Sequence, residues 1–111
     1  MLPRTWNGSA EYAGGQPYRG YRYIVTLLLR QDERDLSGTW SEQDVGTGTA
    51  HSYSVSGHVD GATVELRYTK WDARYHLTGR VGEEADTRRT VLVGLGGNED
   101  YSVKFSLAAV P

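Results

Sequence analysis

Four stretches of the chain repeat one five-residue pattern in which an apolar, a polar, a glycine, a polar and an apolar residue follow one another. They are residues 6–10, 36–40, 55–59 and 77–81. Side chains in a strand alternate between two faces, so the glycine and its two apolar neighbours share one face. A glycine repeated on the inward face indicates a tightly curved sheet, where a side chain would collide with the opposite wall. The pattern therefore predicts a closed β-barrel.

Composition narrows the class of protein. The 111 residues fit a single domain, spanning residues 1–111, and the absence of cysteine excludes disulfide bonds. The formal net charge of -2 argues against nucleic acid or an anionic membrane as a partner. The longest apolar stretch, residues 24–29, is too short to span a membrane, and the amino terminus does not read as an export signal. We therefore expect a soluble, cytoplasmic protein.

Apolar residues recur with period two along nearly the whole chain, which predicts about eight strands and no helix. The expected strands are residues 4–13, 18–30, 36–42, 49–59, 62–70, 73–81, 87–95 and 101–110. Every connection is short, so neighbouring strands must pair antiparallel and in chain order. The fold class that follows is all-β, an antiparallel up-and-down meander barrel.

Two turns set the expected register. Asp60-Gly61 is typical of a two-residue hairpin turn, and a loop at Trp71 and Asp72 would close the next hairpin. The cross-strand neighbours that follow from these turns are Val59 with Ala62, Tyr53 with Tyr68, His51 with Lys70, and Tyr68 with Tyr75. Extending the meander places Trp40 near Tyr53, Tyr12 near Tyr21, and Leu95 near Tyr101. Each pair shares a face, as a real ladder requires.

This register gathers aromatic side chains inside one end of the barrel and aliphatic ones inside the other. The predicted ligand-binding residues at the aromatic end are Tyr12, Tyr21, Trp40, Tyr53, Tyr68, Tyr75 and Tyr101, with His51 and Lys70 at the mouth. An eight-stranded barrel is about the smallest that holds one small ligand. Two interpretations stay open: the rings line a cup, or they fill the barrel as ordinary core.

The sequence also contains candidate groups for acid–base chemistry, metal binding and contact with an acidic partner. His51 and Lys70 fit either an acid or base with an anion contact or a solvated rim pair. No His, Asp or Glu residues have metal-ligand spacing, so we expect neither a metal nor a cofactor. Arginines on the outer face of consecutive strands could meet an acidic partner or simply be solvated.

Two segments carry a resemblance to known families. Residues 36–43 and 74–81 resemble strand motifs of the avidin family, and Trp6-Asn7-Gly8 is similar to the opening of calycin barrels, which include lipocalins. The resemblance implies the barrel architecture and a tendency to bind small molecules inside it. Avidins open with the Gly-Thr-Trp strand and carry biotin-contacting tryptophans on later strands, whereas Trp71 here falls in a turn, so biotin binding is not implied.

Three functions are compatible with these residues. The first is a small-molecule-binding barrel that holds a planar or apolar ligand in the tyrosine-lined cup. The second is an enzyme on the same scaffold, such as a cyclase or isomerase, that polarises its substrate with tyrosine hydroxyls, His51 or Lys70. The third is a protein-interaction or inhibitor module. The expected partner is a small apolar or aromatic molecule, and oligomer formation stays open.

Overall fold

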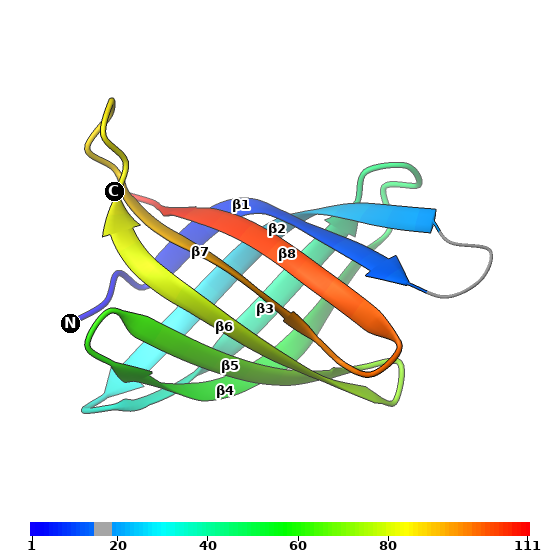
Figure 1. Cartoon of the computed structure of the whole chain (residues 1–111), viewed down its shortest axis with the longest axis horizontal. Coiled ribbons are helices and arrows are strands. Elements are labelled where there is room, and N and C mark those ends of the chain that lie inside the picture. Colours follow the sequence, from blue (N-terminus) through cyan, green and yellow to red (C-terminus); the bar gives the residue numbers. More distant parts are fainter. Residues whose placement is uncertain (15–18) are drawn as a thin grey trace.

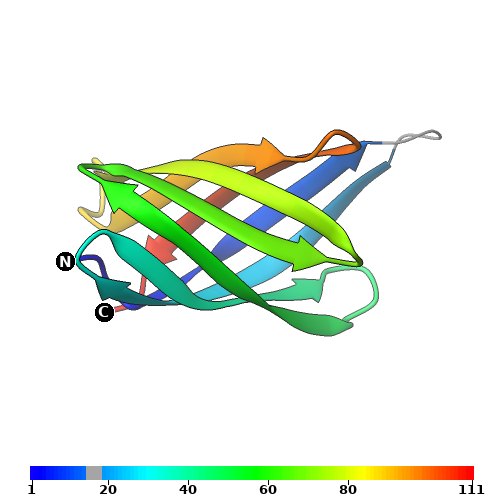
Figure 2. The same cartoon turned by 90° about the horizontal axis from the view of Figure 1, so that it is seen from below.

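The chain forms a closed antiparallel β-barrel in a computed structural model that describes residues 1–14 and 19–111 (Figures 1 and 2). The strands are β1 (Thr5–Gly14), β2 (Arg19–Asp32), β3 (Asp35–Asp44), β4 (Ala50–Asp60), β5 (Thr63–Lys70), β6 (Ala73–Glu83), β7 (Thr90–Gly97) and β8 (Tyr101–Ala109). Each strand pairs with the next in chain order, and β1 pairs with β8 to close the wall. The predicted fold class is confirmed. The predicted start of the second strand at residue 18 lies outside the described residues.

The β5–β6 hairpin has the predicted register. Trp71 and Asp72 form its two-residue turn with φ angles of 52° and 63°, which fits a type I′ turn. Tyr68 therefore lies opposite Tyr75. The pairings of Trp40 with Tyr53 and of Tyr12 with Tyr21 are also confirmed.

The β4–β5 hairpin is shifted by two residues from its predicted register. Gly61 and Ala62, rather than Asp60 and Gly61, form the turn, because Gly61 supplies a positive φ of 60° at the first central position. Val59 pairs with Val64, and Tyr68 pairs with Val55 instead of Tyr53. An even shift leaves every side chain on its predicted face. The expected pairing of His51 with Lys70 is wrong, because the ladder ends at Val55 and Tyr68.

The pairing predicted for Leu95 is also wrong. Leu95 lies opposite Lys104 and is exposed on the outer wall. The side chain of Asn98 accepts hydrogen bonds from the backbone N–H groups of Asp100 and Tyr101 at 2.9 and 2.8 Å, which draws these residues into a tight turn. The β7–β8 ladder consequently begins one residue outside that turn, at Gly97 and Ser102.

The inward glycines mark close approaches between strands. A Cβ on Gly38 or Gly57 would lie 1.8 Å from a carbonyl oxygen of the neighbouring strand, and one on Gly8 would lie 2.0 Å from such an oxygen. At Gly79 a Cβ would come within 2.9 Å of the ring of Phe105. The predicted curvature is therefore present, but at the first three positions the obstacle is the adjacent strand and not the opposite wall.

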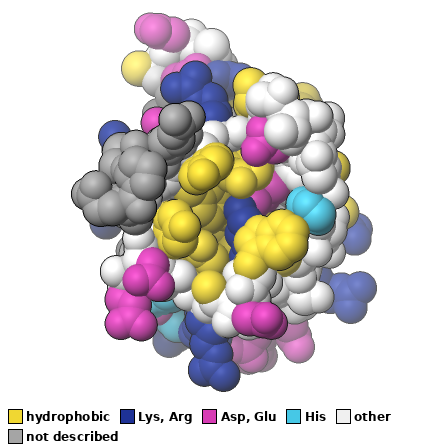
Figure 3. Space-filling model, turned by 90° about the vertical axis from the view of Figure 1, so that its right-hand side faces the viewer, with side chains coloured by type: hydrophobic (Ala, Val, Ile, Leu, Met, Phe, Trp, Pro, Cys, Tyr) yellow, Lys and Arg dark blue, Asp and Glu magenta, His cyan; other side chains and the backbone are white. Residues whose placement is uncertain are grey.

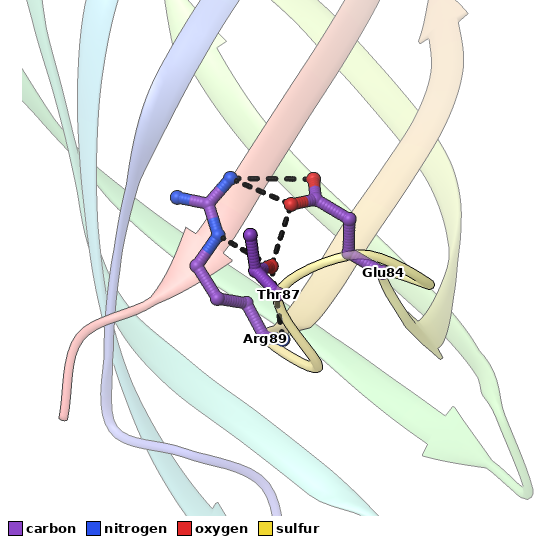
Figure 4. Close-up of polar contacts among 3 residues, drawn as sticks. All are labelled: Glu84, Thr87 and Arg89. Atoms are coloured by element: carbon purple, nitrogen blue, oxygen red, sulfur yellow. Dashed lines mark hydrogen bonds and ion pairs between the residues drawn. The ribbon is translucent and has the colours of Figure 1, made fainter.

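The two ends of the barrel differ in their connections. Both termini and the β6–β7 connection lie at one end, and the β5–β6 and β7–β8 turns lie at the other, which we call the mouth (Figure 1). In the β6–β7 connection the Glu84 carboxylate accepts hydrogen bonds from the Thr87 hydroxyl at 2.6 Å and from the Arg89 guanidinium at 3.1 Å (Figure 4). These hydrogen bonds lower the pKa of Glu84 below its ordinary value.

The end with the termini has an apolar interior. Its buried side chains include Trp6, Leu27, Leu29, Leu36, Val59, Leu92 and Leu107. The indole N–H of Trp6 donates a hydrogen bond to the carbonyl oxygen of Pro3 at 2.9 Å, and Leu2 packs against the core there. No helix long and apolar enough to cross a membrane occurs in residues 1–14 and 19–111.

Candidate functional site

A buried carboxylate organises the interior toward the mouth. The Glu42 side chain accepts hydrogen bonds from the Lys70 ammonium at 2.7 Å, from the Trp40 indole N–H at 2.8 Å and from the Tyr12 hydroxyl. The hydroxyl of Tyr12 is in turn hydrogen-bonded to that of Tyr68. Glu42 and Lys70 are only 2% and 5% exposed, so each charge needs the other to offset the cost of leaving water.

Strand alternation explains why these groups meet. Glu42 follows Trp40 by two residues on β3, so both point inward, and Lys70 follows Tyr68 in the same way on β5. Tyr12 enters from β1. The network therefore joins three strands that are not neighbours in the sheet, and among the described residues it leaves no buried side-chain nitrogen or oxygen without a hydrogen-bond partner.

The Lys70 ammonium also lies against aromatic rings. Its Nζ is 3.8 Å from the ring centroid of Tyr12 and 4.1 Å from that of Tyr23, which is cation–π distance. Lys70 is therefore an interior residue, and its interpretation as half of a solvated rim pair is wrong. His51 does stay exposed at the rim, where its ring and that of Trp71 are in an edge-to-face arrangement with a centroid distance of 5.1 Å.

Stacked rings fill the barrel beneath the mouth. Tyr68 stacks between Trp40 and Tyr75, with centroid distances of 5.4 and 5.3 Å and interplanar angles of 14° and 9°. The ring of Tyr53 also lies next to that of Tyr68, with a centroid distance of 6.0 Å and an interplanar angle of 29°. In this layer the aromatic side chains act as packed core, as one of the two sequence-based interpretations expected.

Above the stack a hollow of about 350 Å³ opens at the mouth. It is lined by Tyr12, Tyr21, Tyr23, Lys70, Trp71, Ala73, Tyr75 and Tyr101. Figure 3 faces this end and shows hydrophobic side chains surrounding a recessed basic group. The hollow thus has aromatic walls, and the buried pair of Lys70 and Glu42 lies at its floor.

The predicted site residues divide between two layers. Tyr12, Tyr21, Lys70, Tyr75 and Tyr101 line the hollow, whereas Trp40, Tyr53 and Tyr68 belong to the stack below and His51 lies on the rim. Whether any of them binds a ligand stays a prediction.

Sequence reasoning missed four residues of this region, namely Glu42, Tyr23, Trp71 and Ala73. A signal for Glu42 was available, since it has the same strand parity as the inward Trp40. Trp71 was correctly expected in a turn, but nothing in the local pattern shows that its ring reaches over the mouth.

Four tyrosines of this region, Tyr12, Tyr23, Tyr53 and Tyr68, have surroundings that favour the neutral phenol over the phenolate. Desolvation raises the pKa of Tyr12 and of Tyr68 far above the ordinary value, and the nearby Glu42 carboxylate raises both further. Desolvation and Glu42 also raise the pKa of Tyr23 and of Tyr53 to about 12. These four side chains consequently offer hydroxyl groups and π faces rather than phenolate ions at neutral pH.

On the outer face of the barrel, two histidines from β4 and β6 lie beside one carboxylate of β5. His58 pairs with Glu65 at 2.6 Å, and His76 lies 3.8 Å from the same carboxylate. The outer wall there holds a shallow hollow of about 760 Å³ whose lining includes Arg67, Arg74 and His76. No group of three His, Asp or Glu residues within the described ranges could hold a metal ion.

Comparisons with known proteins support the fold but do not assign the chain to a family. No protein-family model matches the chain, and no curated protein matches it in sequence. Among solved structures, that of Rv2717c from M. tuberculosis aligns with 99% of this chain and 93% of its own, with a TM-score of 0.57 and 12% sequence identity. At that identity the likeness shows the barrel architecture alone.

Proposed function

We propose that the protein is a calycin-like binding barrel that holds one small, planar, uncharged molecule in the hollow at its mouth. The observation that carries this proposal is a hollow of about 350 Å³ walled by tyrosine and tryptophan side chains. Binding pockets for small ligands start near about 300 Å³ and are mostly apolar with a few polar groups. The hollow therefore suits a ligand of two or three fused rings, and tyrosine hydroxyls can orient it.

The charge at the floor of the hollow favours a neutral ligand. Lys70 is the basic residue of the lining, but its charge is already paired with Glu42 at 2.7 Å. A carboxylate entering the hollow would compete with Glu42 for the same ammonium and add an uncompensated charge. Binding is also favoured over catalysis, because both oxygen atoms of Glu42 already accept hydrogen bonds.

Titration with 2-naphthol, followed by tryptophan fluorescence, tests the proposal. Trp71 lines the hollow, whereas Trp40 lies in the stack and Trp6 at the far end, so Trp71 should respond most. The change Tyr101→Ala removes part of the wall and should weaken binding about tenfold. The matched control is Leu95→Ala, because Leu95 is 64% exposed on the outer wall and should leave the affinity unchanged.

The anion 2-naphthoate provides the second comparison and should bind more weakly than 2-naphthol. Equal loss of affinity in Tyr101→Ala and Leu95→Ala would show that the ligand sits elsewhere. Failure of every neutral planar compound to bind, with a response confined to polyanions, would contradict the proposed function.

A second candidate function uses the outer wall. The larger hollow lined by Arg67, Arg74 and His76 has the charge to receive an acidic partner. Neither arginine forms an ion pair within the described part of the chain. Binding to this wall should weaken steeply with added salt and be lost in Arg67→Ser/Arg74→Ser, changes that leave the mouth untouched.

A further inference from the structure

We propose that Lys70 captures ligands that carry an aldehyde group, by forming a protonated imine on Nζ with Glu42 as the counter-ion. The inference rests on the proposed function, because the aldehyde must first enter the hollow at the mouth. It goes beyond that function by assigning a covalent step and a class of ligand, planar conjugated aldehydes.

The position of Lys70 is the first argument. A lysine amine is the side chain that condenses with carbonyl compounds, and the chain has two lysines. Lys70 lines the hollow, with Nζ against the faces of Tyr12 and Tyr23, whereas Lys104 lies exposed on the outer wall. An aromatic aldehyde bound in the hollow would bring its carbonyl carbon beside Nζ and away from bulk water.

The chemistry conserves both atoms and charge. The ammonium releases a proton to water, and the neutral amine adds to the carbonyl carbon to give a carbinolamine. Protonation of the carbinolamine hydroxyl and loss of water then leave the iminium ion. The net change converts one ammonium and one aldehyde into one iminium and one water, with a single positive charge on each side.

Glu42 explains why this modification suits the site better than others. The carboxylate is 2% exposed and receives its charged hydrogen bond from Nζ at 2.7 Å. An iminium keeps the positive charge and one N–H, so it can preserve that bond. Acylation of Nζ would produce a neutral amide and leave a buried carboxylate without its counter-ion, which is strongly unfavourable. The site therefore selects carbonyl compounds that condense over reagents that acylate.

The test uses 2-naphthaldehyde as the probe, with 2-naphthylmethanol as its matched alcohol. The protein is incubated with the aldehyde and sodium cyanoborohydride, which reduces the iminium to a stable secondary amine, and peptide mass mapping locates the adduct. We expect labelling of Lys70 to exceed that of Lys104 by about tenfold or more, because the hollow raises the local aldehyde concentration. The alcohol should compete with this labelling.

Two variants complete the design. Lys70→Arg keeps a positive charge opposite Glu42 but cannot form the imine, so the adduct in the mouth should disappear while melting experiments confirm folding. Lys104→Arg is the matched control and should leave the labelling of Lys70 unchanged. The comparison of Lys70 with Lys104 inside the unaltered protein gives an answer even where Lys70→Arg does not fold.

The outcomes separate the two proposals. Preferential, alcohol-sensitive labelling of Lys70 supports the imine. Binding of the alcohol without preferential labelling of Lys70 overturns the imine and leaves the proposed function standing. Equal labelling of Lys70 and Lys104, together with no binding of the alcohol, overturns both.

Discussion

The two ends of this barrel are built from the same eight strands but are stabilised in different ways. At the end with the termini, large aliphatic side chains and Trp6 fill the interior. Burial of their apolar surface supplies the stabilising free energy there. Toward the mouth the interior holds a buried ion pair, hydrogen-bonded tyrosines and a ring stack. An apolar core tolerates substitutions that conserve side-chain volume. A buried polar network, in contrast, depends on every hydrogen-bonding partner being present.

Along the inward face of a single strand, the side chains change from apolar at one end to polar at the other. The inward residues of β5 run from Val64 through Leu66 and Tyr68 to Lys70, and β3 changes in the same way from Leu36 to Glu42. The change from apolar to polar side chains occurs at the same height on strands that are not adjacent. The polar groups of these strands can therefore form hydrogen bonds with one another. We infer that several strands jointly specify the polar end. The difference between the polar and the apolar end can be tested by substitution.

The largest effect is expected from breaking the ion pair. Lys70→Met leaves Glu42 as an unpaired buried charge and should cost about 3–5 kcal/mol of the free energy of unfolding. Removing both charges in Glu42→Gln/Lys70→Met should recover most of that loss. Urea denaturation of the parent, Glu42→Gln, Lys70→Met and the double variant measures the coupling between the two residues. A double variant as unstable as Lys70→Met would mean that the polar end depends on shape more than on charge.

Truncating a buried side chain at the apolar end should destabilise the protein by leaving a cavity. Leu27 is fully buried, and Leu27→Ala should cost about 2–5 kcal/mol. Its sequence neighbour Leu28 is 48% exposed, so Leu28→Ala should cost far less and controls for strand propensity. Both values come from urea denaturation. Similar losses in the two variants would contradict the placement of the core on this face of β2.

The third expected effect is a loss of stability when a side chain is added at an inward glycine, where two strands approach closely. A Cβ added by Gly38→Ala would lie 1.8 Å from a backbone oxygen of β2, which cannot move without disturbing the ladder, so we expect a loss of about 1–3 kcal/mol. In Gly82→Ala the new Cβ meets nothing within 4 Å, and stability should be nearly unchanged. Thermal melting of the two variants makes the comparison, and equal melting temperatures would refute the close approach.

The fold could be predicted from the sequence because its signals are local. Strand alternation and the Trp71-Asp72 turn depend on neighbouring residues alone, and both were confirmed. The β4–β5 register could not be settled in this way. Gly61 serves equally well at either central position of a turn, and both choices keep the same side chains inward.

The site was harder to predict because its depth depends on tertiary packing. Whether Tyr68 borders an open cup or closes it depends on how its ring meets those of Trp40 and Tyr75, which lie on other strands. Alternation does place Glu42 inward, but a charged residue near a strand end is ordinarily read as solvated. Its burial follows only from its three hydrogen-bond donors.

Deleting one hydroxyl should have a smaller effect than deleting a charge. Tyr12→Phe keeps the ring but removes hydrogen bonds to Glu42 and Tyr68, with an expected cost of about 1–3 kcal/mol. Tyr21 is 47% exposed, and Tyr21→Phe should change stability by less than about 0.5 kcal/mol. Denaturation of both variants measures the difference. A cost in Tyr12→Phe as small as in Tyr21→Phe would show that the network contributes little to stability.

The smallest expected effect is the response of the polar end to alkaline pH. Burial raises the pKa of Tyr12 and Tyr68 in the folded protein, while the unfolded chain ionises near the ordinary value of 10. The unfolded state therefore loses protons first, so stability is constant well below pH 10, begins to fall as the pH approaches 10 and continues to fall above it. At pH 10 each residue should account for a loss of about 0.4 kcal/mol, because half of the unfolded chains then carry the phenolate. Urea denaturation from pH 8 to pH 10 should show a shallower decline in Tyr68→Phe than in the parent, since one such group is absent. An identical decline in both would mean that the Tyr68 hydroxyl is open to solvent, and the contrast between a sealed polar layer and an open mouth above it would fail.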